Sequence, residues 1–240
     1  MIPIGDMSRY LPISTTIGLV RAPLKVVDPV ERHRHRRWAK MWKNEVRFRR
    51  LQGSVEAFLR ELLPLVPGVS TRDVYVEAGR WTALFNNQRY GSDPAHISLL
   101  AEELGVEAIR VTVSRGQFPG ERKHRNAEGW GFSYWNKGAE VRSVMVSNEF
   151  GRWKLYDIGP RLKWEEPLSG SPRDAFSLEV FGRYLDRFEL RPWNSAFYGA
   201  EALLVERDFG AETVQFGVDS QALPEDLSNL AWNVLDKVPR

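Results

Sequence analysis

Residues 130–158, WGFSYWNKGAEVRSVMVSNEFGRWKLYDI, decide the expected fold. Three segments of this stretch are rich in aromatic and β-branched residues and are expected to be strands: 130–135, 141–147 and 153–158. The connections Asn136-Lys137-Gly138 and Phe150-Gly151 have the composition of tight turns. Because tight turns join neighbouring antiparallel strands, the stretch predicts an antiparallel meander.

Strand and helix patterns continue on both sides of this meander. Further strands are expected at 73–77, 81–85, 109–113, 200–206 and 213–217. Helices are expected where apolar residues recur every three or four positions, at 54–62, 94–104, 174–190 and 224–236. Strands outnumber helices and do not alternate strictly with them. The sequence therefore predicts an α+β fold, a mostly antiparallel sheet flanked by helices.

The N-terminal region differs in composition from the rest of the chain. Residues 1–30 contain four prolines and no sustained periodicity, which predicts an extended arm. Residues 31–51 contain neither Pro nor Gly, which predicts a basic helix. A polar loop at 116–129 marks a candidate boundary between two subdomains. We thus expect three regions, of which the last two could form one continuous domain: 1–52, 53–116 and 117–240.

Residues 32–50 are the most strongly charged part of the chain. They contain nine Arg or Lys and one Glu, a local charge of +8. The whole chain carries only +3, so the remainder carries −5. If the stretch is helical, Trp38 and Trp42 lie near one face, with most of the cations toward the other. Such an uneven distribution indicates a contact surface.

Three interpretations of this predicted helix are open. Its guanidinium groups could neutralise phosphates while Trp stacks on unpaired bases. Its Trp face could instead pack on the core, with the basic face solvated. It could also dock onto an acidic protein partner. The candidate binding residues are Arg34, Arg36, Arg37, Trp38, Lys40, Trp42, Lys43, Arg47, Arg49 and Arg50.

The sequence shows no recognisable catalytic or metal-binding motif. It has no Cys, which excludes disulfides, thiolate metal sites and Cys nucleophiles. A P-loop, a Rossmann glycine fingerprint, an H-E-x-x-H helix and a G-x-S-x-G elbow are missing. His33 and His35 fall on different faces of a helix, and His96 and His124 are expected to be solvated. We therefore expect no catalytic residues, no cofactor and no metal.

The pattern of apolar residues predicts a cytoplasmic protein without a membrane partner. The longest apolar stretch, 62–69, is interrupted by Pro64 and Pro67 and falls far short of the roughly 20 residues of a spanning helix. Asp6 and Pro12 near the start argue against a signal peptide. The lack of Cys also fits a reducing compartment.

Several segments resemble small bacterial cytosolic proteins of uncharacterised function and immunity-type proteins of bacterial toxin systems. The similar segments are Gly79–Asn87, Gly91–Pro94, Leu99–Gly105, Gly151–Glu166 and Arg183–Phe188. The resemblance covers about half of the chain and leaves residues 1–52 unmatched. It brings no catalytic residues and implies a protein that works by binding.

These observations predict a non-enzymatic, macromolecule-binding protein of bacterial type. We expect it to act through protein–protein contacts, in an immunity or assembly role, with a partner protein or by self-association. The alternative is a nucleic-acid-binding protein that uses residues 32–50. A second alternative is an enzyme with an unrecognised carboxylate site.

Overall fold

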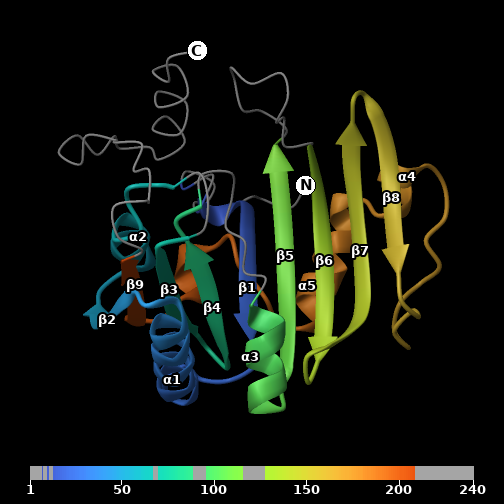
Figure 1. Cartoon of the computed structure of the whole chain (residues 1–240). Coiled ribbons are helices and arrows are strands. Elements are labelled where there is room, and N and C mark those ends of the chain that lie inside the picture. Colours follow the sequence, from blue (N-terminus) through green and yellow to red (C-terminus); the bar gives the residue numbers. More distant parts are fainter. Residues whose placement is uncertain are drawn as a thin grey trace.

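The protein is described by a computed structural model that covers Met7, Tyr10 and residues 13–66, 70–88, 96–115 and 128–208. In these described residues nine strands form one sheet, in the order β2-β9-β3-β4-β1-β5-β6-β7-β8, as Figure 1 shows. Every pairing between neighbouring strands is antiparallel. The predicted α+β class with an antiparallel sheet is confirmed.

The strands and helices follow one another along the whole described chain. The strands are β1 (Thr16–Val20), β2 (Glu45–Gln52), β3 (Arg72–Ala78), β4 (Trp81–Asn86), β5 (Glu107–Arg115), β6 (Glu128–Asn136), β7 (Ala139–Glu149), β8 (Arg152–Ile158) and β9 (Glu201–Asp208). The α-helices are α1 (Leu24–Trp42), α2 (Val55–Arg60), α3 (Ile97–Leu104), α4 (Pro172–Ala175) and α5 (Leu178–Arg187). Two short 3₁₀ helices are η2 (Ile13–Thr15) and η3 (Ser195–Phe197).

The meander expected from residues 130–158 is present as β6, β7 and β8. β6 pairs with β7 and β7 with β8. Lys137 and Gly138 have φ angles of 51° and 85°, and Phe150 and Gly151 have φ angles of 54° and 85°. Two successive positive φ angles are the requirement of the tight turn that matches the twist of paired strands. The local sequence therefore determines this part of the sheet.

The predicted N-terminal arm contains a central strand of the sheet, which the sequence analysis missed. β1 pairs with β4 on one side and with β5 on the other. Residues 17–20 are all buried, because Ile17 and Leu19 pack into one hydrophobic core and Val20 packs into a second core on the opposite face of the sheet. A strand buried on both faces lacks the alternation of apolar and polar residues by which strands are recognised.

The single basic helix predicted over 31–51 is wrong beyond residue 42. Helix α1 begins earlier, at Leu24, and its C-cap Lys43 adopts a left-handed conformation with φ 54° and ψ 38°. Strand β2 follows at once and pairs with β9 along its full length. In β2 the half-buried Val46 and Phe48 alternate with exposed Arg47 and Arg49, which is the period of a strand. The absence of Pro and Gly was not enough to make this segment helical.

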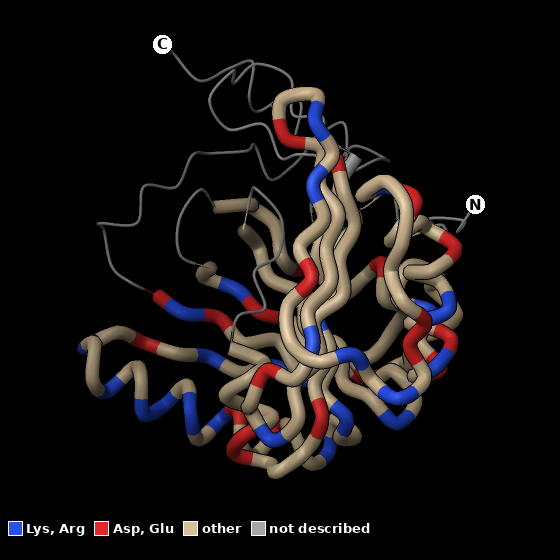
Figure 2. Tube along the Cα trace, turned by 90° about the vertical axis from the view of Figure 1, so that its right-hand side faces the viewer, with Lys and Arg blue, Asp and Glu red and all other residues tan. Residues whose placement is uncertain are grey.

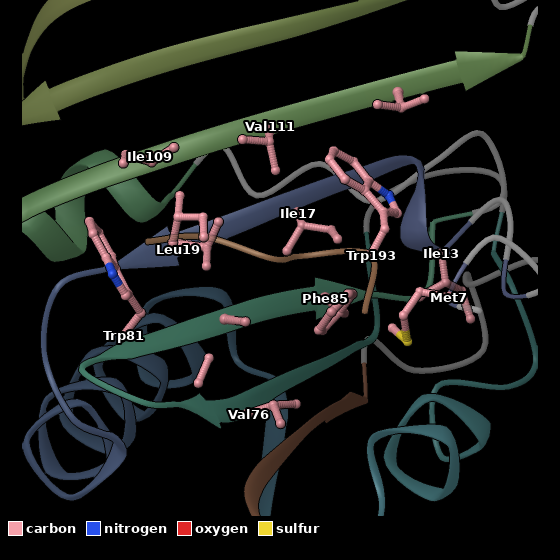
Figure 3. Close-up of a cluster of buried hydrophobic side chains, with 14 of the residues drawn as sticks. Met7, Ile13, Ile17, Leu19, Val76, Trp81, Phe85, Ile109, Val111 and Trp193 are labelled. Carbon is pink, nitrogen blue, oxygen red and sulfur yellow. The ribbon is translucent and has the colours of Figure 1, made fainter. Parts of the chain in front are cut away.

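Helices cover both faces of the sheet. Helices α1 and α3 lie in front of the sheet in Figure 1, and α4 and α5 lie behind it. The core on the rear face includes Ile17, Leu19, Phe85 and Val111, and Figure 3 shows these side chains together. The smaller core on the front face includes Val27 of α1. The front core also includes Leu100 of α3, so it holds α1 and α3 on the same side of the sheet.

The remaining predicted elements agree with the structure where it describes them. Strands β3, β4, β5 and β9 and helices α2 and α3 lie where they were expected. The predicted helix 174–190 is divided into α4 and α5, because the Ser177 side chain accepts a hydrogen bond from the Val180 N–H and starts a new helix. The strand predicted at 213–217, the helix at 224–236 and most of the loop at 116–129 lie outside the described residues. β5 and β6 pair across that loop, so one sheet contains strands from all three predicted regions.

The central position of β1 leads to a stability prediction. We expect Leu19→Ala to lower the free energy of unfolding by about 2–5 kcal/mol, because Leu19 is fully buried between the two halves of the sheet. Urea denaturation measures this change, with the exposed Lys25→Ala as the control. A loss below about 1 kcal/mol would show that β1 is not part of the core.

Candidate functional site

The C-terminal half of α1 presents cations and two large apolar side chains to solvent. Met41 is 62% exposed and Trp42 is 54% exposed. The cations around them, Arg36, Arg37, Lys40 and Lys43, are also exposed. We call these six residues the α1 patch. In Figure 2, basic segments follow one another along this helix at the lower left.

The α1 patch follows from the way the helix packs on the sheet. The buried positions of α1 recur every three or four residues: Leu24, Val27, Asp28, Glu31, Arg34, His35 and Ala39. Residues between them therefore point to solvent. After Ala39 no residue of the helix is buried, so its last turn is exposed on all sides.

Cations of the α1 patch lack a negative partner within the described residues. No ion pair joins Arg37, Lys40 or Lys43 to a carboxylate in the described ranges. The Arg36 guanidinium lies 5.3 Å from the centroid of the Phe48 ring. These side chains can therefore offer their charge to another molecule without breaking an internal ion pair.

The basic residues of β2 are engaged with carboxylates of the same chain. Arg49 lies 2.5 Å from Glu61 and 3.4 Å from Glu206, measured between guanidinium nitrogen and carboxylate oxygen. The hydrogen bond to Glu61 raises the pKa of Arg49 above its usual value. Arg50 lies 2.8 Å from Asp28, and Arg47 lies 3.5 Å from Glu45.

Two of the predicted binding residues contact the interior. Arg34 is 1% exposed, and its Nη2 lies 2.8 Å from Glu31 Oε1. Trp38 is half-buried and stacks on Trp42 with ring centroids 6.0 Å apart. Trp38 also meets the His35 ring edge to face at 5.2 Å. Of the ten predicted binding residues, Arg36, Arg37, Lys40, Trp42 and Lys43 are exposed in the C-terminal half of α1 or at its C-cap.

Beneath α1 lies a group of buried polar side chains that the sequence analysis did not predict. We call Glu31, His35, Tyr75 and His96 the buried polar cluster. The Tyr75 hydroxyl donates a hydrogen bond of 2.8 Å to Glu31 Oε2. It also lies 2.9 Å from His96 Nε2 and 3.3 Å from His35 Nε2. His35 Nε2 lies 3.2 Å from Glu31 Oε2.

A second ion pair adjoins the buried polar cluster. Asp73 Oδ2 lies 2.8 Å from Arg207 Nη2 and 3.9 Å from His35 Nε2. Ser70 Oγ donates to Asp73 Oδ1 at 2.9 Å. These contacts link β3 and β9 to α1, and they supply the buried Asp73 with partners for its charge.

The environment shifts the pKa values of the cluster in different directions. Burial, together with the charges of Glu31 and Asp73, raises the pKa of the Tyr75 phenol well above its usual value. Burial also favours the neutral form of Glu31, but the hydrogen bond from His35 and the charge of Arg34 outweigh it and hold its pKa below the usual range. Burial lowers the pKa of His96 against the opposing pull of the carboxylates. The cluster thus places a carboxylate, a neutral phenol and a neutral His96 imidazole side by side.

The histidines depart in part from what the sequence predicted. His33 is exposed and His35 is buried, so the prediction that they lie on different faces is confirmed. His96 was expected to be solvated, but it is half-buried and contacts Tyr75. No metal was expected, yet ligand atoms of Glu31, His35 and His96 lie within 4.8 Å of one another. The spacing of Glu31 and His35 by four residues was the only sequence signal of this cluster.

Comparison with known proteins finds no matching family model, no matching curated relative and no matching solved structure. The resemblance to immunity-type proteins is therefore a prediction that these comparisons do not test. Among the described residues no helix is long and apolar enough to cross a membrane. Any function assigned to this chain must rest on the geometry of its own residues.

The unequal burial of the two tryptophans leads to a mutational prediction. Trp42→Ala should lower the free energy of unfolding by less than about 1 kcal/mol, because most of the ring is in solvent. Trp38→Ala should lower it by about 2–3 kcal/mol, because the ring packs on His35 and His96. Urea denaturation of both variants checks the difference. Equal losses would contradict the placement of Trp42 in solvent.

Asp28 provides a pH-dependent prediction about the link between α1 and β2. Burial alone would raise the pKa of this carboxyl, but hydrogen bonds from Arg32 and Arg50 hold it below the usual range. A depressed pKa stabilises the fold above the unfolded-state pKa of about 3.9, and this contribution disappears as the pH falls through the lower folded-state pKa.

We therefore expect Asp28→Ala to lower the free energy of unfolding by about 1–3 kcal/mol at pH 7, and by less at pH 3. Denaturant titration at the two pH values measures the difference. Glu45→Ala is the control, because Glu45 pairs with Arg47 only in solvent and should change stability by less than about 0.5 kcal/mol. A loss for Asp28→Ala that is equal at both pH values would show that its charge does not stabilise the fold.

Proposed function

We propose that this protein acts in the cytoplasm as a non-enzymatic binding protein, and that the α1 patch docks onto an acidic surface of a partner protein. One observation carries the proposal. Met41 and Trp42 are both exposed in the last turn of α1, and Arg37, Lys40 and Lys43 in the same part of the chain have no carboxylate partner within the described residues. An immunity or assembly role fits such a contact.

The composition of the patch favours a protein partner. Aromatic residues, Met and Arg are enriched at the centre of protein interfaces, and Trp and Arg contribute most to binding energy. Trp42 is held by its stack on Trp38, so it loses little side-chain freedom when it binds. The surrounding cations would attract an acidic surface and increase the rate of association.

Nucleic acid is the alternative ligand, since unpaired cations beside an exposed Trp can also bind phosphates and stack on a base. The arrangement of the basic residues favours nucleic acid less than a protein partner. Arg34 is buried, and Arg49 and Arg50 already pair with carboxylates. The continuous track of cations that a phosphate backbone would follow is therefore interrupted. An enzyme built on Glu31 is disfavoured further, because its side chain is fully buried.

The test compares two charge-reversal variants of equal charge. Arg37→Glu, Lys40→Glu and Lys43→Glu together reverse the α1 patch. Three cations near β8, reversed in the same way, form the control: Arg152, Arg161 and Lys163, which are exposed and have no ion pair within the described residues.

A photo-crosslinking amino acid at position 42 identifies the partner in the cells that make the protein, and calorimetry with the purified partner then measures affinity. We expect the patch variant to bind at least about tenfold more weakly, which is about 1.4 kcal/mol, and the control variant to bind as the wild type does. Equal effects of both variants would rule out the α1 patch as the contact.

The same pair of variants tests nucleic acid as the alternative ligand. A single-stranded oligonucleotide bound by the wild type with a steep salt dependence, and not by the patch variant, would replace the protein-binding proposal with nucleic-acid binding. Weak binding that is equal in the wild type, the patch variant and the control variant would show that the oligonucleotide does not bind at the α1 patch.

A further inference from the structure

Four polar atoms from three separate elements converge on one point beneath α1. Three of them, Glu31 Oε2, His35 Nε2 and His96 Nε2, surround the fourth, the Tyr75 hydroxyl, at 2.8, 3.3 and 2.9 Å. The hydroxyl gives its single proton to Glu31, whose Oε2 also lies 3.2 Å from His35 Nε2, so His96 Nε2 is left to donate to the hydroxyl oxygen. Three polar partners thus lie within 3.3 Å of one hydroxyl beneath α1.

We propose that the buried polar cluster is a binding site for a divalent transition metal ion, best suited to Zn²⁺, with Glu31, His35, His96 and Tyr75 as ligands. Tetrahedral zinc with bonds of roughly 2.0–2.2 Å places neighbouring ligand atoms roughly 3.3–3.5 Å apart. The Tyr75 oxygen lies 2.8, 2.9 and 3.3 Å from the other three ligand atoms. Two of these distances are a few tenths of an ångström shorter than the spacing around zinc, and the third matches it. A small expansion of the cluster would therefore accommodate the ion.

The donor set has the chemistry of a zinc site. Two imidazole nitrogens and a carboxylate are among the protein ligands that zinc takes most often. The chain has no Cys, so any such site must be built from nitrogen and oxygen. Glu31 and His35 lie four residues apart on one face of α1, an arrangement that directs both side chains to the same ion.

The charged groups around the buried polar cluster have a net negative charge. Three carboxylates, those of Glu31, Asp73 and Glu103, face two guanidinium groups, those of Arg34 and Arg207. Their sum is one negative charge, which a cation would offset.

Neighbouring groups hold the ligands in place. Arg34 Nη2 lies 2.8 Å from the second oxygen of Glu31, so it orients the carboxylate. The backbone carbonyl of His96 accepts a hydrogen bond of 3.3 Å from Arg34 Nη1, which places the same arginine against a second ligand. A bound ion would join α1, β3 and the start of α3 at one point.

The test titrates the metal-stripped full chain with Zn²⁺ by calorimetry and with Co²⁺ by visible absorption, which reports tetrahedral coordination. We expect one ion per chain. His96→Gln should weaken binding at least about 100-fold, and Tyr75→Phe should weaken it by about tenfold. His33→Gln is the control, since His33 is exposed on the same helix, and it should bind as the wild type does.

A measurement on the wild type keeps the proposal independent of whether the variants fold. In ¹⁵N-histidine-labelled protein, Zn²⁺ should shift the Nε2 resonances of His35 and His96 and leave those of His33 unchanged. Failure of the folded wild type to bind either ion would overturn the proposal, and so would ion binding that shifts neither His35 nor His96. In both cases the cluster is a hydrogen-bonded network only.

Discussion

Backbone pairing of β1 on both of its sides is the constraint on which the rest of the structure depends. β1 joins β4 of the block β2-β9-β3-β4 to β5 of the block β5-β6-β7-β8, and within the described strands it is the only link in the sheet between them. Its buried residues also fill both cores, with Leu19 on one face and Val20 on the other. Helix α1 follows β1 directly, so its start, its direction and the surface that it exposes all follow from this strand.

Both faces of the sheet hold their helices by apolar packing together with buried charged groups. On the rear face α5 packs through aromatic contacts, as between Phe132 and Tyr184, and Tyr184 also contacts the buried ion pair of Arg142 and Glu165. On the front face α1 rests partly on charged and polar groups, among them Glu31 and Arg34. Replacing a buried ion pair with apolar residues is often neutral or stabilising, so such a pair is weak evidence for stability. The ionic contacts are better suited to fixing the rotation of α1 about its axis.

The sequence predicts well those features that depend on neighbouring residues. The meander β6-β7-β8 was predicted because alternation and turn residues are local properties, visible at Asn136-Lys137-Gly138. β1 was missed because a strand buried on both faces lacks alternation. In β2 Val46 and Phe48 do alternate with arginines, but the preceding helix was expected to continue through them, and only the pairing with the distant β9 distinguishes the two conformations. The same holds for the buried polar cluster, since nothing near His96 in the sequence points to Tyr75 or Glu31. Exposure of Trp42 and half-burial of Trp38 likewise depend on where α1 ends relative to the sheet.

The position of β9 determines which strands of the nascent chain remain unpaired during synthesis. β9 lies between β2 and β3, although it follows both by more than one hundred residues, and it is the neighbour of β2 in the sheet. A nascent chain that ends before residue 201 therefore has β2 without its partner and β3 with one side open. Unpaired strand edges are templates for association between chains. The Arg residues of β2, including Arg47, Arg49 and Arg50, keep this edge charged during that interval and discourage association until β9 is made.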